Sequence, residues 1–87
     1  MGKLQVHNKR IDAWFVVENG KVYDANTMIE LSSGCREYVG VLQYVERQMK
    51  VLWGKMSEID PIWGDLQEYH RIEREWLRMR VALYGEA

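Results

Sequence analysis

Hydrophobic positions in the first third of the chain follow the pattern of short β-strands. Residues 11–17 are rich in β-branched and aromatic side chains, and residues 22–25 form a second such run. Between the runs lie Asn19 and Gly20, which tolerate the positive φ angles of a type I′ turn. The pattern therefore predicts a β-hairpin. Its expected register pairs Glu18 with Lys21, Val17 with Val22, and Val16 with Tyr23.

Two shorter apolar runs flank this hairpin and extend the predicted sheet. Residues 28–31 are expected to form a third strand, and residues 4–6 can add a fourth. Residues 1–33 are therefore predicted to form an antiparallel β-meander of three or four short strands. Both faces of the hairpin carry apolar side chains, so one face is expected to cover the helices. The other face is a candidate contact surface for a protein partner, formed by Trp14, Val16 and Tyr23.

The hydrophobic period changes to that of an α-helix near Gly34. Apolar side chains now recur at alternating spacings of three and four, at Cys35, Tyr38, Leu42, Val45, Met49, Leu52, Met56 and Ile59. This stripe predicts a helix over residues 34–60, capped by residues 32–34 and ended at either Gly54 or Asp60. A second, partial stripe lies about 200° around the helix and consists of Val41, Tyr44 and Val51.

A second helix is expected to follow at once. Asp60 suits an N-cap, and Pro61 suits the first helical position because its missing N–H would have no helical partner there. Residues 61–85 carry an apolar inner face at Ile62, Leu66, Tyr69, Ile72, Trp76, Met79 and Leu83. So short a connection predicts an antiparallel αα-hairpin. We therefore expect one α+β domain over residues 1–87, with the meander packed on the helical hairpin.

Tryptophan and glycine recur together around the predicted bend, in Leu52-Trp53-Gly54 and in Ile62-Trp63-Gly64. The favoured interpretation is structural, because a bulky ring can fill the gap at the tight end of a helical hairpin. Glycine would permit the backbones to approach each other there.

The charge is balanced along the chain, which changes the range of expected partners. Residues 1–34 carry four basic and four acidic side chains, residues 35–60 again four and four, and residues 61–87 four and five. Nucleic acid or an anionic membrane surface would favour a basic excess that no segment shows. With Cys35 as the only cysteine and no apolar run of membrane or signal-peptide type, a reducing, cytoplasmic location is expected.

Residues able to carry chemistry are few and scattered. His7, Cys35 and His70 are the only soft metal-ligand candidates, and they lie far apart in the sequence. Each serine and threonine falls at a predicted cap or turn, and no phosphate-binding loop or nucleophile motif is present. We expect Cys35 and His70 to be structural. The sequence therefore predicts no catalytic site, no metal and no cofactor.

Three arginines, Arg71, Arg74 and Arg78, share one face of the second predicted helix. They could form a patch for phosphate or for an acidic partner. The alternative is a solvated face, in which Glu68 and Glu75 pair with these arginines at spacings of three and four. The intervening carboxylates would repel a nucleic-acid backbone, which favours a protein as the partner if the patch is functional.

These observations together predict a small, non-enzymatic protein-binding module, of the kind that acts as an accessory factor or inhibitor in bacteria and phages. The alternative is a small nucleic-acid-binding or regulatory protein that uses Arg71, Arg74 and Arg78. A homodimer through the helical hairpin is also expected, because only one side of the first helix can face the second. In that arrangement the stripe formed by Val41, Tyr44 and Val51 would pair with its copy.

Overall fold

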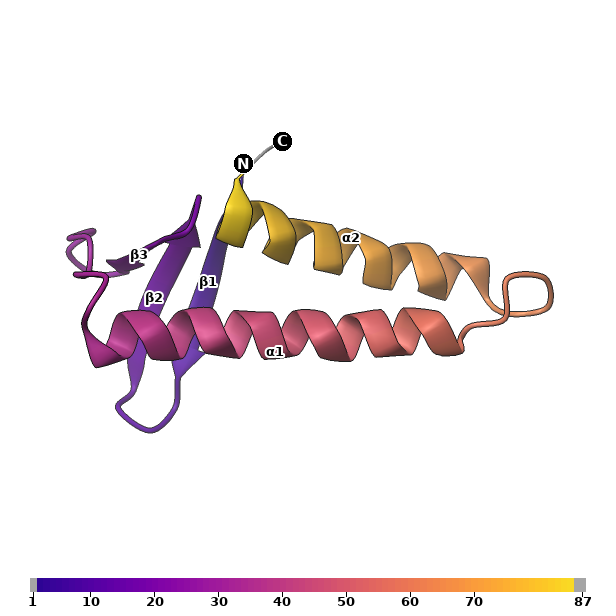
Figure 1. Cartoon of the computed structure of the whole chain (residues 1–87), viewed down its shortest axis with the longest axis horizontal. Helices are drawn as coiled ribbons and strands as arrows, with labels where there is room; N and C mark the ends of the chain where they lie inside the picture. The colour runs from indigo at the N-terminus through magenta and orange to yellow at the C-terminus, as the bar shows by residue number, and fades with distance from the viewer. Residues whose placement is uncertain (1, 86–87) are drawn as a thin grey trace.

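A computed structural model describes residues 2–85 and shows an antiparallel sheet followed by two helices (Figure 1). The elements are β1 (Lys3–Asn8), β2 (Ala13–Glu18), β3 (Lys21–Asp24), α1 (Arg36–Glu58) and α2 (Leu66–Tyr84). The strands lie in the order β1-β2-β3, and consecutive strands pair antiparallel. The predicted α+β fold, a meander packed on a helical hairpin, is therefore confirmed.

The β2–β3 hairpin has the predicted register and turn. Glu18 pairs with Lys21, Val17 with Val22, and Val16 with Tyr23. Asn19 and Gly20 adopt positive φ angles of 53° and 76°, as a type I′ turn requires. This turn also contacts both helices, since the Gly20 N–H donates to the Ala82 carbonyl at 2.8 Å and the Tyr38 hydroxyl donates to the Gly20 carbonyl at 3.0 Å. The hairpin turn thus joins the sheet to the helices.

The run at residues 28–31, expected to be a strand, forms a single bridge between Tyr23 and Glu30 instead. The Asp24 carboxylate accepts from the N–H groups of Asn26 and Thr27, which curls the chain immediately after β3. Met28 then adopts a φ of 57°, outside the extended region. This local turn leaves too few extended residues for a strand at residues 28–31. The run at residues 4–6, in contrast, lies within the six-residue strand β1.

The start and end of α1 differ from the expected positions by a few residues. Its N-cap is Cys35, whose Sγ accepts from the Tyr38 N–H at 3.4 Å, so residues 32–34 precede the cap. The helix continues through Gly54 and ends at Glu58, and neither of the two expected ends is used. Gly54 lies in the interior of α1, and the i→i−4 hydrogen bonds of the helix continue on both sides of it. This glycine therefore does not end the helix.

The predicted start of α2 at Pro61 was wrong. The helix begins at Leu66, because the Asp65 carboxylate accepts from the N–H groups of Gln67 and Glu68 and acts as the N-cap. Asp60 also accepts two backbone N–H groups, but these belong to a turn in the loop between the helices. Two aspartates therefore offer the same capping chemistry, and the second one begins the helix.

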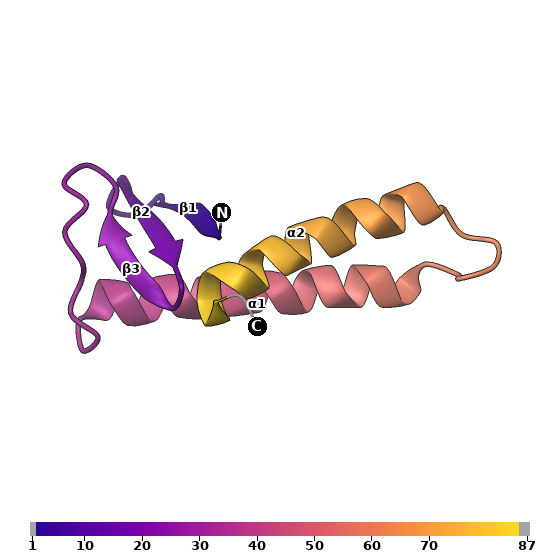
Figure 2. The ribbon, with the colours of Figure 1, turned by 90° about the horizontal axis from the view of Figure 1, so that it is seen from above.

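The molecule has two clusters of buried hydrophobic residues, and the half-buried Met79 packs against both. The sheet core joins the inner face of the sheet to α1 and α2 and contains Val6, Phe15, Val17, Val22, Val41, Val45, Ala82 and Leu83. The arm core lies where the two helices pack on each other beyond the sheet; its buried members are Leu52, Met56 and Ile72, and half-buried apolar side chains pack against them. Figure 2 shows the sheet over one end of the helices, so the other end projects as a two-helix arm.

The projecting arm makes the chain extended for its length. Its radius of gyration is 14.6 Å and its extents are 46 × 29 × 20 Å, whereas a compact chain of this length has a radius of gyration of about 12 Å. Little of the rest of the protein therefore packs against the arm.

Candidate protein-binding surfaces

The outer face of the sheet offers less apolar surface than the sequence suggested. Val16 is only 7% exposed, so it is not available to a partner. Tyr23 is half-buried, and Trp14 is about half exposed with its ring stacked on His7 at a centroid distance of 4.5 Å. The Nε2 atom of His7 lies 3.0 Å from the carboxylate of Asp12. This face presents one ordered tryptophan and a polar surround.

The stripe expected on the free side of the first helix is not continuous. Val41 is 4% exposed because it belongs to the sheet core, so the sheet covers the first member of the stripe. Tyr44 and Val51 remain exposed, two turns apart. The structure therefore separates the three residues that the sequence placed together.

The arginine face of α2 is partly neutralised by carboxylates. Arg71 donates through Nε to Glu68 at 3.1 Å, and its Nη1 lies 3.7 Å from Glu75. The hydrogen bond with Glu68 raises the pKa of Arg71, and the same bond holds the pKa of Glu68 below its ordinary value. Arg74 and Arg78 are exposed, and within residues 2–85 no ion pair joins them to a carboxylate. Only these two arginines of the face are open to a partner.

Cys35 and His70 each interact with a residue of the helix that they begin or belong to. Cys35 is half-buried at the N-cap of α1, and its sulfur accepts a backbone hydrogen bond. His70 is exposed, and its Nδ1 lies 3.6 Å from Glu73 one turn along α2. Among the described residues, no group of three His, Cys, Asp or Glu side chains is placed to hold a metal ion.

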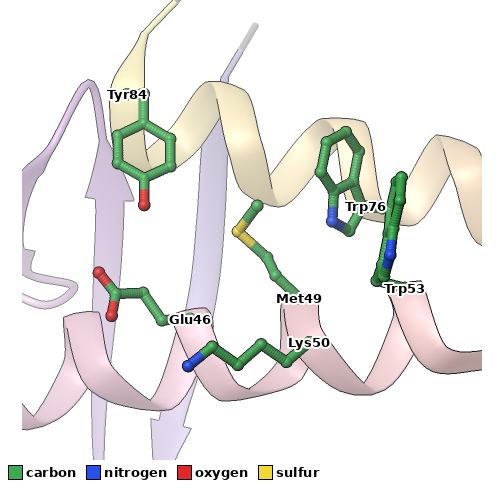
Figure 3. Close-up of a pocket in the computed structure, with 6 residues that line it drawn as sticks. All are labelled: Glu46, Met49, Lys50, Trp53, Trp76 and Tyr84. Atoms are coloured by element: carbon green, nitrogen blue, oxygen red, sulfur yellow. The ribbon is translucent and has the colours of Figure 1, made fainter.

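An aromatic groove runs between α1 and α2 where the sheet ends (Figure 3). It has a volume of about 480 Å³ and is lined by Glu46, Met49, Lys50, Trp53, Trp76 and Tyr84. Figure 3 shows Tyr84 and Trp76 projecting from α2 towards Met49 on α1, with Trp53 beside Trp76. The two indole rings lie 5.5 Å apart at 45°, and the Arg80 guanidinium lies 5.8 Å from the Trp76 ring.

A second surface is the tip loop, residues 59–65, at the far end of the arm. Ile62 is 77% exposed and Trp63 is 87% exposed, although both are large apolar side chains. The Asp60 carboxylate accepts from the N–H groups of Ile62 and Trp63 at 2.8 and 3.0 Å. The Gly64 N–H donates to the Asp60 carbonyl, and a Cβ at Gly64 would lie 2.4 Å from that oxygen. The loop is thus tightly closed while the side chains of Ile62 and Trp63 are left in solvent.

Protonation of Asp60 is expected to loosen the tip loop. The backbone N–H groups of Trp63 and Ile62 hold the pKa of Asp60 below its ordinary value. A depressed pKa in the folded state means that the charged carboxylate stabilises the loop above the unfolded value, near pH 4, and that this contribution is lost as the pH falls. Amide NMR signals of Ile62 and Trp63 should therefore shift below about pH 4. In Asp60→Asn this titration should disappear, and its persistence there would assign it to another group.

Sequence reasoning missed the groove and the tip loop as surfaces. The signal that could have found them was the repeated Trp-Gly pair around the bend, which was interpreted as a filled gap. Gly64 does permit a close backbone approach, as that interpretation required. Trp63, however, fills no gap, and Trp53 is also exposed. Apart from its chain neighbours and the nearby backbone of its own helix, no described atom lies within 4 Å of a Cβ built at Gly54, so no other element packs closely on this glycine.

A basic hollow lies between the β1–β2 loop and the side of α1. It has a volume of about 560 Å³, and its described lining residues include no carboxylate. The lining consists of Val6, His7, Asn8, Lys9, Arg10, Gly40, Val41, Tyr44 and Arg47. The fold thus brings together Lys9, Arg10 and Arg47, which lie on separate segments of the sequence.

Comparison with protein-family models, with curated proteins and with solved structures gave no match. Neither of the two described helices combines the length and the apolar character that crossing a membrane would require. The surfaces described above are therefore interpreted from their geometry and chemistry alone.

Proposed function

We propose that this chain is a non-enzymatic protein-binding module that inserts the tip loop into an apolar pocket of a partner protein. The observation that carries the proposal is the near-complete exposure of Ile62 and Trp63 on a loop closed by Asp60 and Gly64. Tryptophan is enriched among the residues that dominate binding energy at interfaces. A loop already closed by its own hydrogen bonds loses less conformational entropy when it binds.

The size of the exposed anchor suits a specific contact. Burial of one tryptophan removes about 150–250 Å² from water, which corresponds to about 4–6 kcal/mol before the cost of association. The position at the end of a projecting arm allows the loop to enter a recess in a larger protein. We propose an accessory factor or inhibitor of the bacterial or phage type, which acts by occupying such a recess. The unpaired Cys35 supports a cytoplasmic location.

Site-specific photo-crosslinking in the native cell is the test of this proposal. A photoreactive benzophenone side chain placed at position 63 should form one discrete adduct that is heavier than two copies of the chain. The matched control places the same group at position 74, which is also exposed on the arm but lies outside the tip loop. Trp63→Ala should keep the fold, because the side chain is largely in solvent, and should abolish the interaction with the captured protein. Identical adducts at both positions would contradict the proposal.

A second candidate function, binding of nucleic acid or regulation through it, is favoured by a different observation. Lys9, Arg10 and Arg47 line the basic hollow without a carboxylate among its described lining residues, whereas Arg71 on the arginine face of α2 is paired with carboxylates. Phosphate-driven binding falls steeply with salt. Binding of DNA or RNA fragments that is lost between about 50 and 200 mM salt, and weakened in Arg47→Ala, would support this candidate.

A further inference from the structure

The chain leaves more surface in solvent than a compact protein of the same mass does. The accessible surface of the chain is 6630 Å², whereas a folded monomer of 10.4 kDa has an accessible surface of about 5400 Å². The difference, about 1200 Å², exceeds the roughly 800 Å² that each partner buries in a standard stable interface. The arm core has only three buried residues, and the large apolar side chains left exposed on the two helices beside it include Val51, Trp53, Leu66 and Leu77. This surface is large enough for a second protein chain.

We propose that the aromatic groove is a homodimer interface, occupied by the same groove of a second copy related by a two-fold axis. The groove places Met49, Trp53, Trp76 and Tyr84 along one side of both helices. A two-fold axis lets one apolar patch cover itself, so both copies become covered without any further element. The result is an antiparallel four-helix arrangement of the two helical hairpins, in which each arm lies beside the sheet end of the other copy's α1.

The charged side chains that line the groove favour a second copy of the same chain as its occupant. Glu46 and Lys50 both line it, and they lie on one face of α1 about 6 Å apart along the helix axis. When two such helices pack antiparallel with the axis between these residues, Glu46 faces Lys50 of the partner subunit. Lys50 faces Glu46 of the partner subunit in the same way. The patch is therefore complementary to itself, whereas a patch of one sign would repel its copy.

The groove is a better dimer surface than the stripe expected from the sequence. The sheet covers Val41, and Tyr44 and Val51 are isolated from each other on the opposite flank of α1. The groove, in contrast, combines side chains from both helices in one hollow. None of the residues that line it belongs to the tip loop, so the dimer and the proposed partner contact use separate surfaces and can be tested separately.

Two single charge reversals and their combinations test the interface. Glu46→Lys gives each groove two positive charges, and Lys50→Glu gives each groove two negative charges. Each variant should raise the dissociation constant of its own dimer about tenfold or more, measured by sedimentation equilibrium. An equimolar mixture of the two variants should form a heterodimer, because each positive groove then faces a negative one. The double variant Glu46→Lys/Lys50→Glu should restore the homodimer. Both residues are exposed, and circular dichroism checks that each variant is folded.

Tyr44→Glu is the matched control, because Tyr44 is exposed on the opposite flank of α1. This variant should dimerise like the wild type. A wild type that stays monomeric at about 100 μM, well above a micromolar dissociation constant, would overturn the inference and leave the groove to a foreign partner. Single reversals that dimerise like the wild type, or a dimer that Tyr44→Glu dissociates, would overturn the groove as the interface. The crosslink at position 63 tests the tip-loop proposal separately, and its outcome does not depend on these results.

Discussion

Replacement of Ile72 by alanine is expected to lower the free energy of unfolding by about 3 kcal/mol, within the range of 2–5 kcal/mol for such core truncations. Ile72 is 3% exposed and packs with Leu52 and Met56, which are the other buried members of the arm core. A core of three residues cannot close readily around the cavity that the lost atoms leave. In a domain of this size the change corresponds to a decrease in Tm of about 12–24 °C.

Hydrogen exchange should show where the stability is lost. The amides of α1 around Leu52 and Met56 should lose protection in Ile72→Ala more than the amides of β2, because the sheet has its own core. Arg74→Ala, an exposed change on the same helix, should alter the free energy of unfolding by no more than about 0.5 kcal/mol. Equal loss of protection in the arm and in the sheet would show that the two cores unfold as one unit.

Gly20→Ala is expected to destabilise the protein by about 2–4 kcal/mol, since it combines two unfavourable effects. The φ of Gly20 is 76°, a conformation that places the Cβ of an L-residue too close to the backbone. The new Cβ would also lie 2.8 Å from the carbonyl oxygen of Leu83, in the last turn of α2. Relief of this clash requires the turn to move, and the hydrogen bond from the Gly20 N–H to Ala82 would then be weakened.

Gly54→Ala provides a control of opposite sign. Gly54 lies inside α1, and apart from its chain neighbours and the nearby backbone of its own helix no described atom is within 4 Å of the Cβ position. Alanine is favoured over glycine in a helix interior by about 1 kcal/mol, so this variant should be more stable than the wild type. Chemical denaturation of both variants measures the difference. If Gly20→Ala were as stable as Gly54→Ala, the junction between the hairpin turn and α2 would not constrain the fold.

The proposed surfaces give the molecule a simple division of roles. The sheet core holds the open end of the helical hairpin, and the arm projects away from it (Figure 1). The arm carries the exposed side chains of Trp53 and Trp63. In the proposed antiparallel dimer, the two tip loops would lie at opposite ends of a four-helix arrangement. Two such loops would let one dimer engage two copies of a partner, and the two contacts would reinforce each other if the partner presents both sites together.

The sequence by itself determined the elements whose signals are local. The Asn19-Gly20 turn, with β-branched residues on both sides, was sufficient for the β2–β3 register, because turn type and side-chain alternation act over a few residues. The heptad spacing was sufficient to predict α1 and its pairing with a second helix. The end of α1 and the start of α2 were less predictable, because Asp60 and Asp65 offer equivalent caps and local chemistry does not decide between them.

Only the tertiary structure decided which apolar residues are covered. The pattern placed Val41 with Tyr44 and Val51, but the sheet packs over Val41 alone and leaves the other two in solvent. The pattern also assigned Trp63 to a filled bend, whereas the turn closed by Asp60 directs it outwards. A periodic pattern specifies the direction of a side chain around its own helix. Whether another element covers that direction depends on contacts between segments far apart in the chain, and these contacts decide the binding surfaces.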